Sequence, residues 1–177
     1  MNNICNKREI DKLIERLGNE DTTVWQPSRF ELARIGKPAV NSLTFALLYD
    51  SNPTVRWRAA EILGDIQESE IVQPLITALA DDNSTVQWCC IEALINLGVQ
   101  ARWELTKALR HESEDVRWGV SRALEGIESR TIIEEQERLQ RILWDNDLIV
   151  EAVDEAWYWQ LVEGNLAQMC VPVIALG

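Results

Sequence analysis

Pro53-Thr-Val-Arg-Trp57 returns in this chain as Ser84-Thr-Val-Gln-Trp88 and again as Glu114-Asp-Val-Arg-Trp118. A weaker copy, Thr22-Thr-Val-Trp25, precedes these three segments. The valines of the four copies stand at positions 24, 55, 86 and 116, so the repeat steps are 31, 31 and 30 residues. Periods of this size are typical of stacked two-helix units, each of which needs its neighbours to bury its apolar face. The sequence therefore predicts an all-α array of repeats.

The third repeat shows the predicted unit most clearly. An apolar helical pattern over 71–79 is followed by a turn, where Asn83 or Ser84 is expected to cap a second helix over 86–97. Gly98 is expected to end that second helix. The same pattern predicts helices at 10–17, 24–35, 39–48, 55–66, 101–109, 116–127, 132–143 and 148–162.

The whole chain is expected to form one domain, because no linker or low-complexity segment interrupts its 177 residues. Terminal units of a solenoid are usually atypical because they close the stack, and the aromatic residues near position 158 are expected to do this. A short apolar tail is expected to fold back on the last unit. The predicted repeats are 8–36, 37–67, 69–98, 99–128 and 130–163, and the tail is 164–177.

The charge of the chain is strongly negative. It has 29 acidic and 17 basic side chains, which gives a net charge of −12. An acidic surface repels phosphate backbones and anionic lipids, so we expect no nucleic-acid partner and no membrane binding. A protein partner with a basic or mixed-charge surface is favoured. The amino-terminal segment lacks the apolar run of a secretory signal, and the four cysteines form no disulfide framework, which predicts a cytoplasmic protein.

Motifs for catalysis and metal binding are missing from the sequence. His111 is the only histidine, so it cannot anchor a zinc site alone, and we expect it at the surface in a turn. Cys89 would need a base or a positive field to become a nucleophile, and His111 is a repeat away. The chain contains no glycine-rich phosphate loop and no nucleophile elbow. We therefore expect binding rather than catalysis, with no catalytic residue, no metal and no cofactor.

Val55-Arg-Trp-Arg-Ala-Ala-Glu-Ile-Leu-Gly-Asp-Ile66 resembles the second helix of a HEAT-like repeat, as do 86–98 and 116–127. The chain is most similar to the short subtype named after the phycobilisome lyase repeats, and the resemblance covers 37–127 well. It implies a right-handed α-α superhelix, or solenoid, of about five two-helix repeats, with the second helices along its concave side. Members of this family include subunits that attach or remove bilin chromophores on light-harvesting proteins, and many others are protein-binding scaffolds.

Trp57, Trp88 and Trp118 share one repeat position. At about 100° per residue, Trp57 falls opposite the apolar stripe that contains Val55. Helices packed about 8–10 Å apart would carry the three rings in a row about 20 Å long. Tryptophan is a favoured interface residue, so this row is a candidate binding surface. The alternative is that each ring fills the space between adjacent repeats.

Polar side chains are expected to surround the tryptophan row. Gly119 and Gly126 are expected to leave open space for a pocket beside Trp118, and an Arg56–Asp50 contact is expected to order the turn. The predicted partner-binding residues are Trp57, Arg58, Glu61, Asp65, Trp88, Cys89, Glu92, Trp118 and Arg122.

These residues and the resemblance suggest two function classes, and a third class, a base-excision or hydroxylase enzyme, is opposed by the charge and the missing motif residues. The first is a non-enzymatic scaffold or adaptor that binds a protein segment along the tryptophan row. The alternative is a phycobilin lyase-like or chromophore-handling subunit, in which a flat tetrapyrrole would rest on the row while Arg58 and Arg122 pair with its propionates. HEAT-like DNA glycosylases also combine concave aromatic residues with a carboxylate, but the acidic charge opposes DNA binding. The hydroxylase with several His-Glu pairs on its HEAT-like repeats is opposed by the single pair His111-Glu112.

Overall fold

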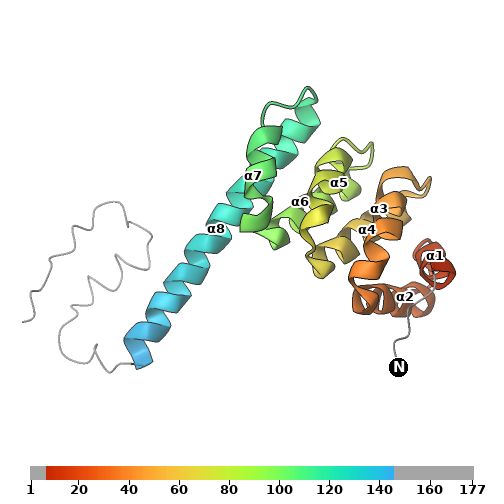
Figure 1. Ribbon diagram of the computed structural model, residues 1–177, viewed down its shortest axis with the longest axis horizontal. Coiled ribbons are helices and arrows are strands. Elements are labelled where there is room, and N and C mark those ends of the chain that lie inside the picture. The colour runs from red at the N-terminus through yellow and green to blue at the C-terminus, as the bar shows by residue number, and fades with distance from the viewer. Residues whose placement is uncertain (1–6, 146–177) are drawn as a thin grey trace, which may run out of the picture. The chain divides into compact units, whose positions relative to one another are not determined.

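The computed structural model describes residues 7–145, which are coloured in Figure 1. These residues form eight α-helices and two short 3-10 helices and contain no strand, which confirms the predicted all-α superhelix. The chain divides into two compact units, 1–128 and 129–177, where the sequence predicted one domain. Among the described residues, no helix combines the length and apolar character that crossing a membrane requires.

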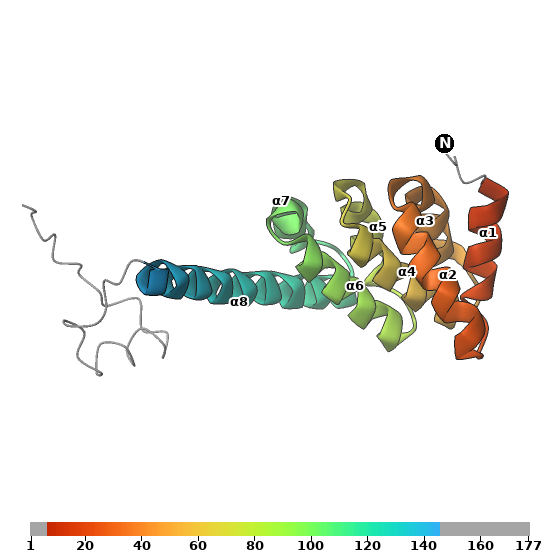
Figure 2. The same cartoon turned by 90° about the horizontal axis from the view of Figure 1, so that it is seen from below.

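The helices of the first unit pair as the repeat pattern predicts, each starting within three residues of its expected position. The first helices α1, α3, α5 and α7 lie in one layer, and the second helices α2, α4, α6 and the start of α8 lie in another (Figure 2). The elements are α1 (Lys7–Arg16), α2 (Thr22–Ile35), η1 (Lys37–Ala39), α3 (Val40–Tyr49), α4 (Pro53–Ile66), η2 (Ser69–Ile71), α5 (Val72–Ala78), α6 (Ser84–Leu97), α7 (Val99–Ala108) and α8 (Glu114–Asp145).

The turn inside each repeat is closed by side chains at the same two repeat positions. In the second repeat the Asp50 carboxylate accepts the Asn52 N–H at 2.8 Å, and Asn52 caps α4 by accepting the Thr54 N–H at 2.9 Å. In the third repeat Asn83 caps α6 in the same way, as predicted. His111 closes the fourth turn through Nδ1, which accepts the Ser113 N–H at 3.1 Å. Equivalent turn hydrogen bonds therefore recur once in each of these repeats.

A second repeated contact follows the valine of each motif. The side chains of Arg56, Gln87 and Arg117 each donate to the backbone carbonyl six residues earlier, at 3.1, 2.8 and 2.7 Å. The predicted contact between Arg56 and Asp50 is thus made by the Asp50 carbonyl and not by its carboxylate.

The carboxylate partner of Arg56 lies in the following repeat. Arg56 Nε and Nη2 donate to the Asp81 carboxylate at 2.8 and 2.9 Å, so this ion pair ties the second repeat to the third. Burial would raise the pKa of the Asp81 carboxyl, but the hydrogen bonds from Arg56 and the Asn83 N–H hold it below its ordinary value.

The core lies between the two helix layers and between successive repeats. The repeated valines Val55, Val86 and Val116 are buried, as the periodicity predicts. Neighbouring second helices also pack very closely, because a Cβ added at Gly64 would lie 2.9 Å from the Cα of Ala93. Glycine at this position lets the backbones of α4 and α6 approach each other.

The predicted break between the fourth and fifth repeats is wrong, because α8 continues from Glu114 to Asp145. The earlier second helices end at Gly36, Gln67 and Gly98, which adopt positive φ angles of 69°, 57° and 58°. Glu128 occupies the equivalent position in the fourth repeat and remains helical, since no glycine or proline follows it before Asp145. The helix predicted at 148–162 and the tail 164–177 lie outside the described residues.

Candidate partner-binding face

The three repeat tryptophans lie on successive second helices but differ in exposure. Trp88 on α6 and Trp118 on α8 are 51% and 53% exposed. Trp57 on α4 is partly buried and packs against the core. The candidate surface is therefore open at two tryptophans and largely closed at the third, and its placement on a concave side stays a prediction.

Arg58 closes the surface beside Trp57. Its guanidinium carbon lies 3.9 Å from the ring centroid of Trp25 and 4.9 Å from that of Trp57. Nη1 donates to the backbone carbonyls of Leu17 and Asn19, the latter at 3.0 Å. Burial lowers the pKa of Arg58, while the nearby Glu61 carboxylate acts in the opposite direction.

The expectation that Arg58 stands at an open, polar rim is wrong. The side chain is only 7% exposed, because two indole rings and the carboxyl end of α1 enclose it. A guanidinium enclosed in this way joins the first two repeats and is not available to a tetrapyrrole propionate or a partner carboxylate.

Cys89 and Gly119 occupy the repeat position that Arg58 has in the second repeat. This position faces the preceding repeat, since a Cβ on Gly119 would lie 2.8 Å from Leu79 Cδ2. A Cβ on Gly126 would likewise collide with Ile95. The pocket expected beside Trp118 is therefore wrong, because side chains of the preceding repeat fill the space that these glycines leave.

The two adjacent cysteines of α6 both have thiol pKa values above the ordinary one. Cys90 is fully buried, and burial raises its pKa well above the ordinary range. Cys89 is partly buried, and burial together with the carboxylates of Glu61 and Glu92 raises its pKa to about 11. A thiol with this pKa is protonated near neutral pH and is a poor nucleophile. Residues 7–145 also contain no group of three potential ligand residues that could hold a metal ion.

Some carboxylates of this face form ion pairs with basic side chains of the same chain, and others do not. Arg29 on α2 binds Asp65 at 2.8 Å and approaches Glu61 at 3.6 Å. Within the part of the chain that the structure describes, Glu92 makes no ion pair. Glu92 follows Trp88 by four residues, so the two share one face of α6. Arg122, one turn after Trp118, pairs with Glu125 at 2.7 Å.

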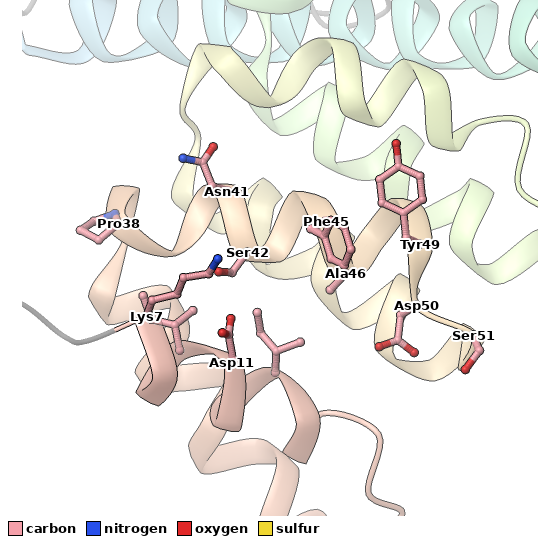
Figure 3. A pocket seen from close by; sticks show the side chains of 12 residues that line it. Lys7, Asp11, Pro38, Asn41, Ser42, Phe45, Ala46, Tyr49, Asp50 and Ser51 are labelled. Atoms are coloured by element: carbon pink, nitrogen blue, oxygen red, sulfur yellow. The ribbon is translucent and has the colours of Figure 1, made fainter.

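Sequence reasoning missed a groove on the other layer. A groove of about 900 Å³ lies between α1 and α3, and Figure 3 shows the side chains of Lys7, Asp11, Phe45 and Tyr49 around it. Phe45 and Tyr49 are exposed, with ring centroids 5.1 Å apart. Two aromatic residues four positions apart on the exposed side of a predicted helix were the signal that could have indicated this groove.

Comparison with known proteins agrees with this architecture. The model of the family described as HEAT repeats matches residues 40–102. One chain from the structure of the complex of CpcE and CpcF of phycocyanin lyase from Nostoc sp. PCC7120 is similar in fold, with a TM-score of 0.55 at 18% identity, and the match covers 89% of this chain and 98% of that chain. Residues 40–102 are thus HEAT repeats, and the array has the fold of that phycocyanin lyase chain.

Two curated relatives of this HEAT-like protein match parts of its length. A HEAT repeat-containing taxis protein of Halobacterium salinarum is 36% identical over 110 residues, which are 59% of this chain and 26% of the relative. An uncharacterized phycocyanin operon protein Z of Pseudanabaena tenuis is 33% identical over 109 residues, which are 57% of this chain and 54% of the relative. The HEAT-like chain thus spans between a quarter and about half of the length of these relatives.

Proposed function

We propose that this HEAT-like repeat protein is a non-enzymatic scaffold that binds a segment of a partner protein across the second-helix layer at Trp88 and Trp118. The proposal depends on the exposure of these two indole rings, at 51% and 53%, while Trp57 at the same repeat position packs against the core. Large exposed aromatic side chains gain most from burial against a partner, and tryptophan is enriched at interface hot spots.

The charges around the tryptophans set the chemistry of the partner. The chain has a net charge of −12, and the carboxylate of Glu92 stands beside Trp88 without an ion pair among residues 7–145. A basic or mixed-charge segment would be attracted to this face and oriented on it. Trp57, Arg58, Glu61 and Asp65 would contribute through the shape of the array, since Arg58 is enclosed and both carboxylates approach Arg29.

Two matched variants test this proposal. Trp103 on α7 is 69% exposed on the first-helix layer, so Trp103→Ala removes a ring of equal size from a different face. The partner is first isolated with the full chain as bait, and its affinity is then measured by calorimetry for both variants. We expect Trp88→Ala to weaken binding by about tenfold or more and Trp103→Ala to leave it unchanged. Equal affinity of the two variants, both with the unfolding midpoint of the natural chain, would overturn the proposal.

A chromophore-handling role is the second candidate. Its support is the likeness of fold to one chain of the complex of CpcE and CpcF of a phycocyanin lyase, which covers 89% of this chain and 98% of that chain. Under this hypothesis Trp88 and Trp118 would contact the flat rings, and Arg122 would remain as a propionate partner because Arg58 is buried. Titration with phycocyanobilin tests it, since binding would shift the visible absorbance of the pigment. An unchanged spectrum at saturating pigment would remove this candidate.

A further inference from the structure

The second repeat shows how this array binds a guanidinium group. Arg58 lies with its guanidinium carbon 3.9 Å from the ring centroid of Trp25 and 4.9 Å from that of Trp57. The Glu61 carboxylate, one helical turn after Trp57, acts on the same charge. Two indole faces and the carbonyls of Leu17 and Asn19 hold this guanidinium, and α4 itself supplies an indole with a carboxylate four residues further along.

The third repeat repeats these elements without the arginine. Trp88 and Glu92 stand where Trp57 and Glu61 stand in the second repeat, and Cys89 replaces Arg58. Cys89 has no long side chain that could cover the Trp88 ring, which is 51% exposed. The carboxylates of Glu61 and Glu92 lie near the Cys89 sulfur and both raise the pKa of its thiol, so the field beside Trp88 is negative.

We propose that Trp88 and Glu92, with Glu61 nearby, form a subsite for an arginine side chain of the partner protein. This inference rests on the proposed function and names the group that the partner supplies. A planar guanidinium stacks on an indole ring and pairs with a carboxylate through a fork of N–H donors, which the compact ammonium of lysine does not match. The positive guanidinium complements the net negative charge of this chain. It also complements the Glu92 carboxylate, which makes no ion pair among residues 7–145.

The fourth repeat offers no second subsite of this kind. Arg122 takes the position that Glu61 and Glu92 hold in the earlier repeats, four residues after Trp118. Its positive charge, held near the surface by Glu125 at 2.7 Å, repels a further guanidinium. Trp118 is therefore left to contact an apolar group of the same partner segment, and the arginine subsite is confined to the third repeat.

The test uses the full chain and three synthetic hexapeptides, made of arginine, lysine or citrulline. Tryptophan fluorescence and calorimetry report binding at low ionic strength. We expect the arginine peptide to bind about fivefold more tightly than the lysine peptide, and the uncharged citrulline peptide to bind at least about tenfold more weakly than arginine. Trp88→Ala and Glu92→Gln should each remove the preference for arginine over lysine, whereas Trp103→Ala should keep it.

The possible outcomes separate this inference from the proposed function. Equal affinities for the arginine and lysine peptides, or an arginine preference that survives in both Trp88→Ala and Glu92→Gln, would overturn the arginine subsite. If Trp88→Ala still loses the isolated partner in that case, the scaffold proposal stands without the subsite. Glu92→Gln changes a partly exposed side chain by one charge, so its fold, checked by circular dichroism, is expected to match that of the natural chain.

Discussion

The second-helix layer contains a closed region at α2 and α4 and an open region at α6 and the start of α8. In the closed region Arg58 lies between Trp25 and Trp57. In the open region Trp88 and Trp118 are about half exposed. The tryptophans at 57, 88 and 118 occupy one repeat position, so position alone does not decide whether the ring packs or faces solvent. Arg58, the residue after Trp57, covers that ring together with the packing around it, whereas Cys89 and Gly119 follow the two exposed rings.

Removing Arg58 is the strongest way to disturb the closed region. Arg58→Ala would leave the carbonyls of Leu17 and Asn19 without their donor and would separate the two indole rings. We expect the free energy of unfolding to fall by about 3 kcal/mol, from a buried hydrogen-bond network and a desolvated cation–π pair. Urea denaturation followed by circular dichroism measures this change.

The control for Arg58→Ala is Arg122→Ala, which breaks an exposed pair with Glu125 in the open region. Its effect should stay below about 0.5 kcal/mol, because exposed helix pairs contribute little. Similar losses for the two variants would contradict the distinction between a closed and an open region.

The reactivity of the Cys89 thiol reports the electrostatic field at the repeat position that Arg58 occupies in the second repeat. Its pKa of about 11 lies two units above the ordinary thiol value of 9.0, so its thiolate forms only as the pH rises toward 11. Alkylation at pH 8 should therefore be about a hundredfold slower than for a small model thiol. Mass spectrometry of a chain with Cys5→Ser and Cys170→Ser follows the reaction at this site.

Glu92→Gln sharpens the Cys89 experiment. The variant removes one of the two carboxylates that raise the thiol pKa, so alkylation of Cys89 should become faster at pH 8. A rate that equals that of the model thiol in the natural chain, or that does not change with Glu92→Gln, would contradict the electrostatic description of the arginine subsite.

Because α4 and α6 approach each other closely at Gly64, adding one methyl group there should destabilise the protein. In Gly64→Ala the new Cβ would lie 2.9 Å from backbone and side-chain carbons of Ala93, so the two helices must move apart. We expect a net loss of about 2 kcal/mol, despite the better helix propensity of alanine. Thermal unfolding of Gly119→Ala is the comparison, since the flexible Leu79 side chain can move aside there. A larger loss for Gly119→Ala than for Gly64→Ala would contradict this interpretation.

The smallest expected effect is the difference in stability loss between alanine variants of two tryptophans at the same repeat position. Trp57→Ala should destabilise the protein by about 1 kcal/mol more than Trp88→Ala, because only Trp57 packs against the core and against Arg58. Chemical denaturation of both variants under the same conditions provides the difference. Equal losses would show that both rings contribute alike to the folded state.

Local sequence was sufficient for most of the helix pattern. The residue pair Asp50 and Asn52 recurs as Asp81 and Asn83, and the hydrogen bonds of these turns span only two residues. Gly98 ends α6 as predicted, because a positive φ is accessible to glycine at little cost. The break expected near residue 128 failed for the same reason, since Glu128 is a good helix former without a stop signal beside it.

The candidate site was less predictable from the sequence. The hydrogen bonds of Arg58 join residues 41 and 39 positions apart, and no repeat pattern indicates where such a long side chain ends. The spaces beside Gly119 and Gly126 were wrongly taken as open for the same reason, because Leu79 and Ile95 come from the preceding repeat. The exposed pair Phe45 and Tyr49 could have been found from helical spacing.

The sequence by itself determined the all-α repeat array, its period, its capped turns and the shared position of three tryptophans. These features depend on hydrogen bonds and apolar spacing between residues that are close along the chain. Only the tertiary structure decided that Arg58 covers Trp57 while Trp88 and Trp118 face solvent. The physical reason is that exposure depends on side chains from the neighbouring repeat, whose volume and reach are set by packing across the array and not by local spacing.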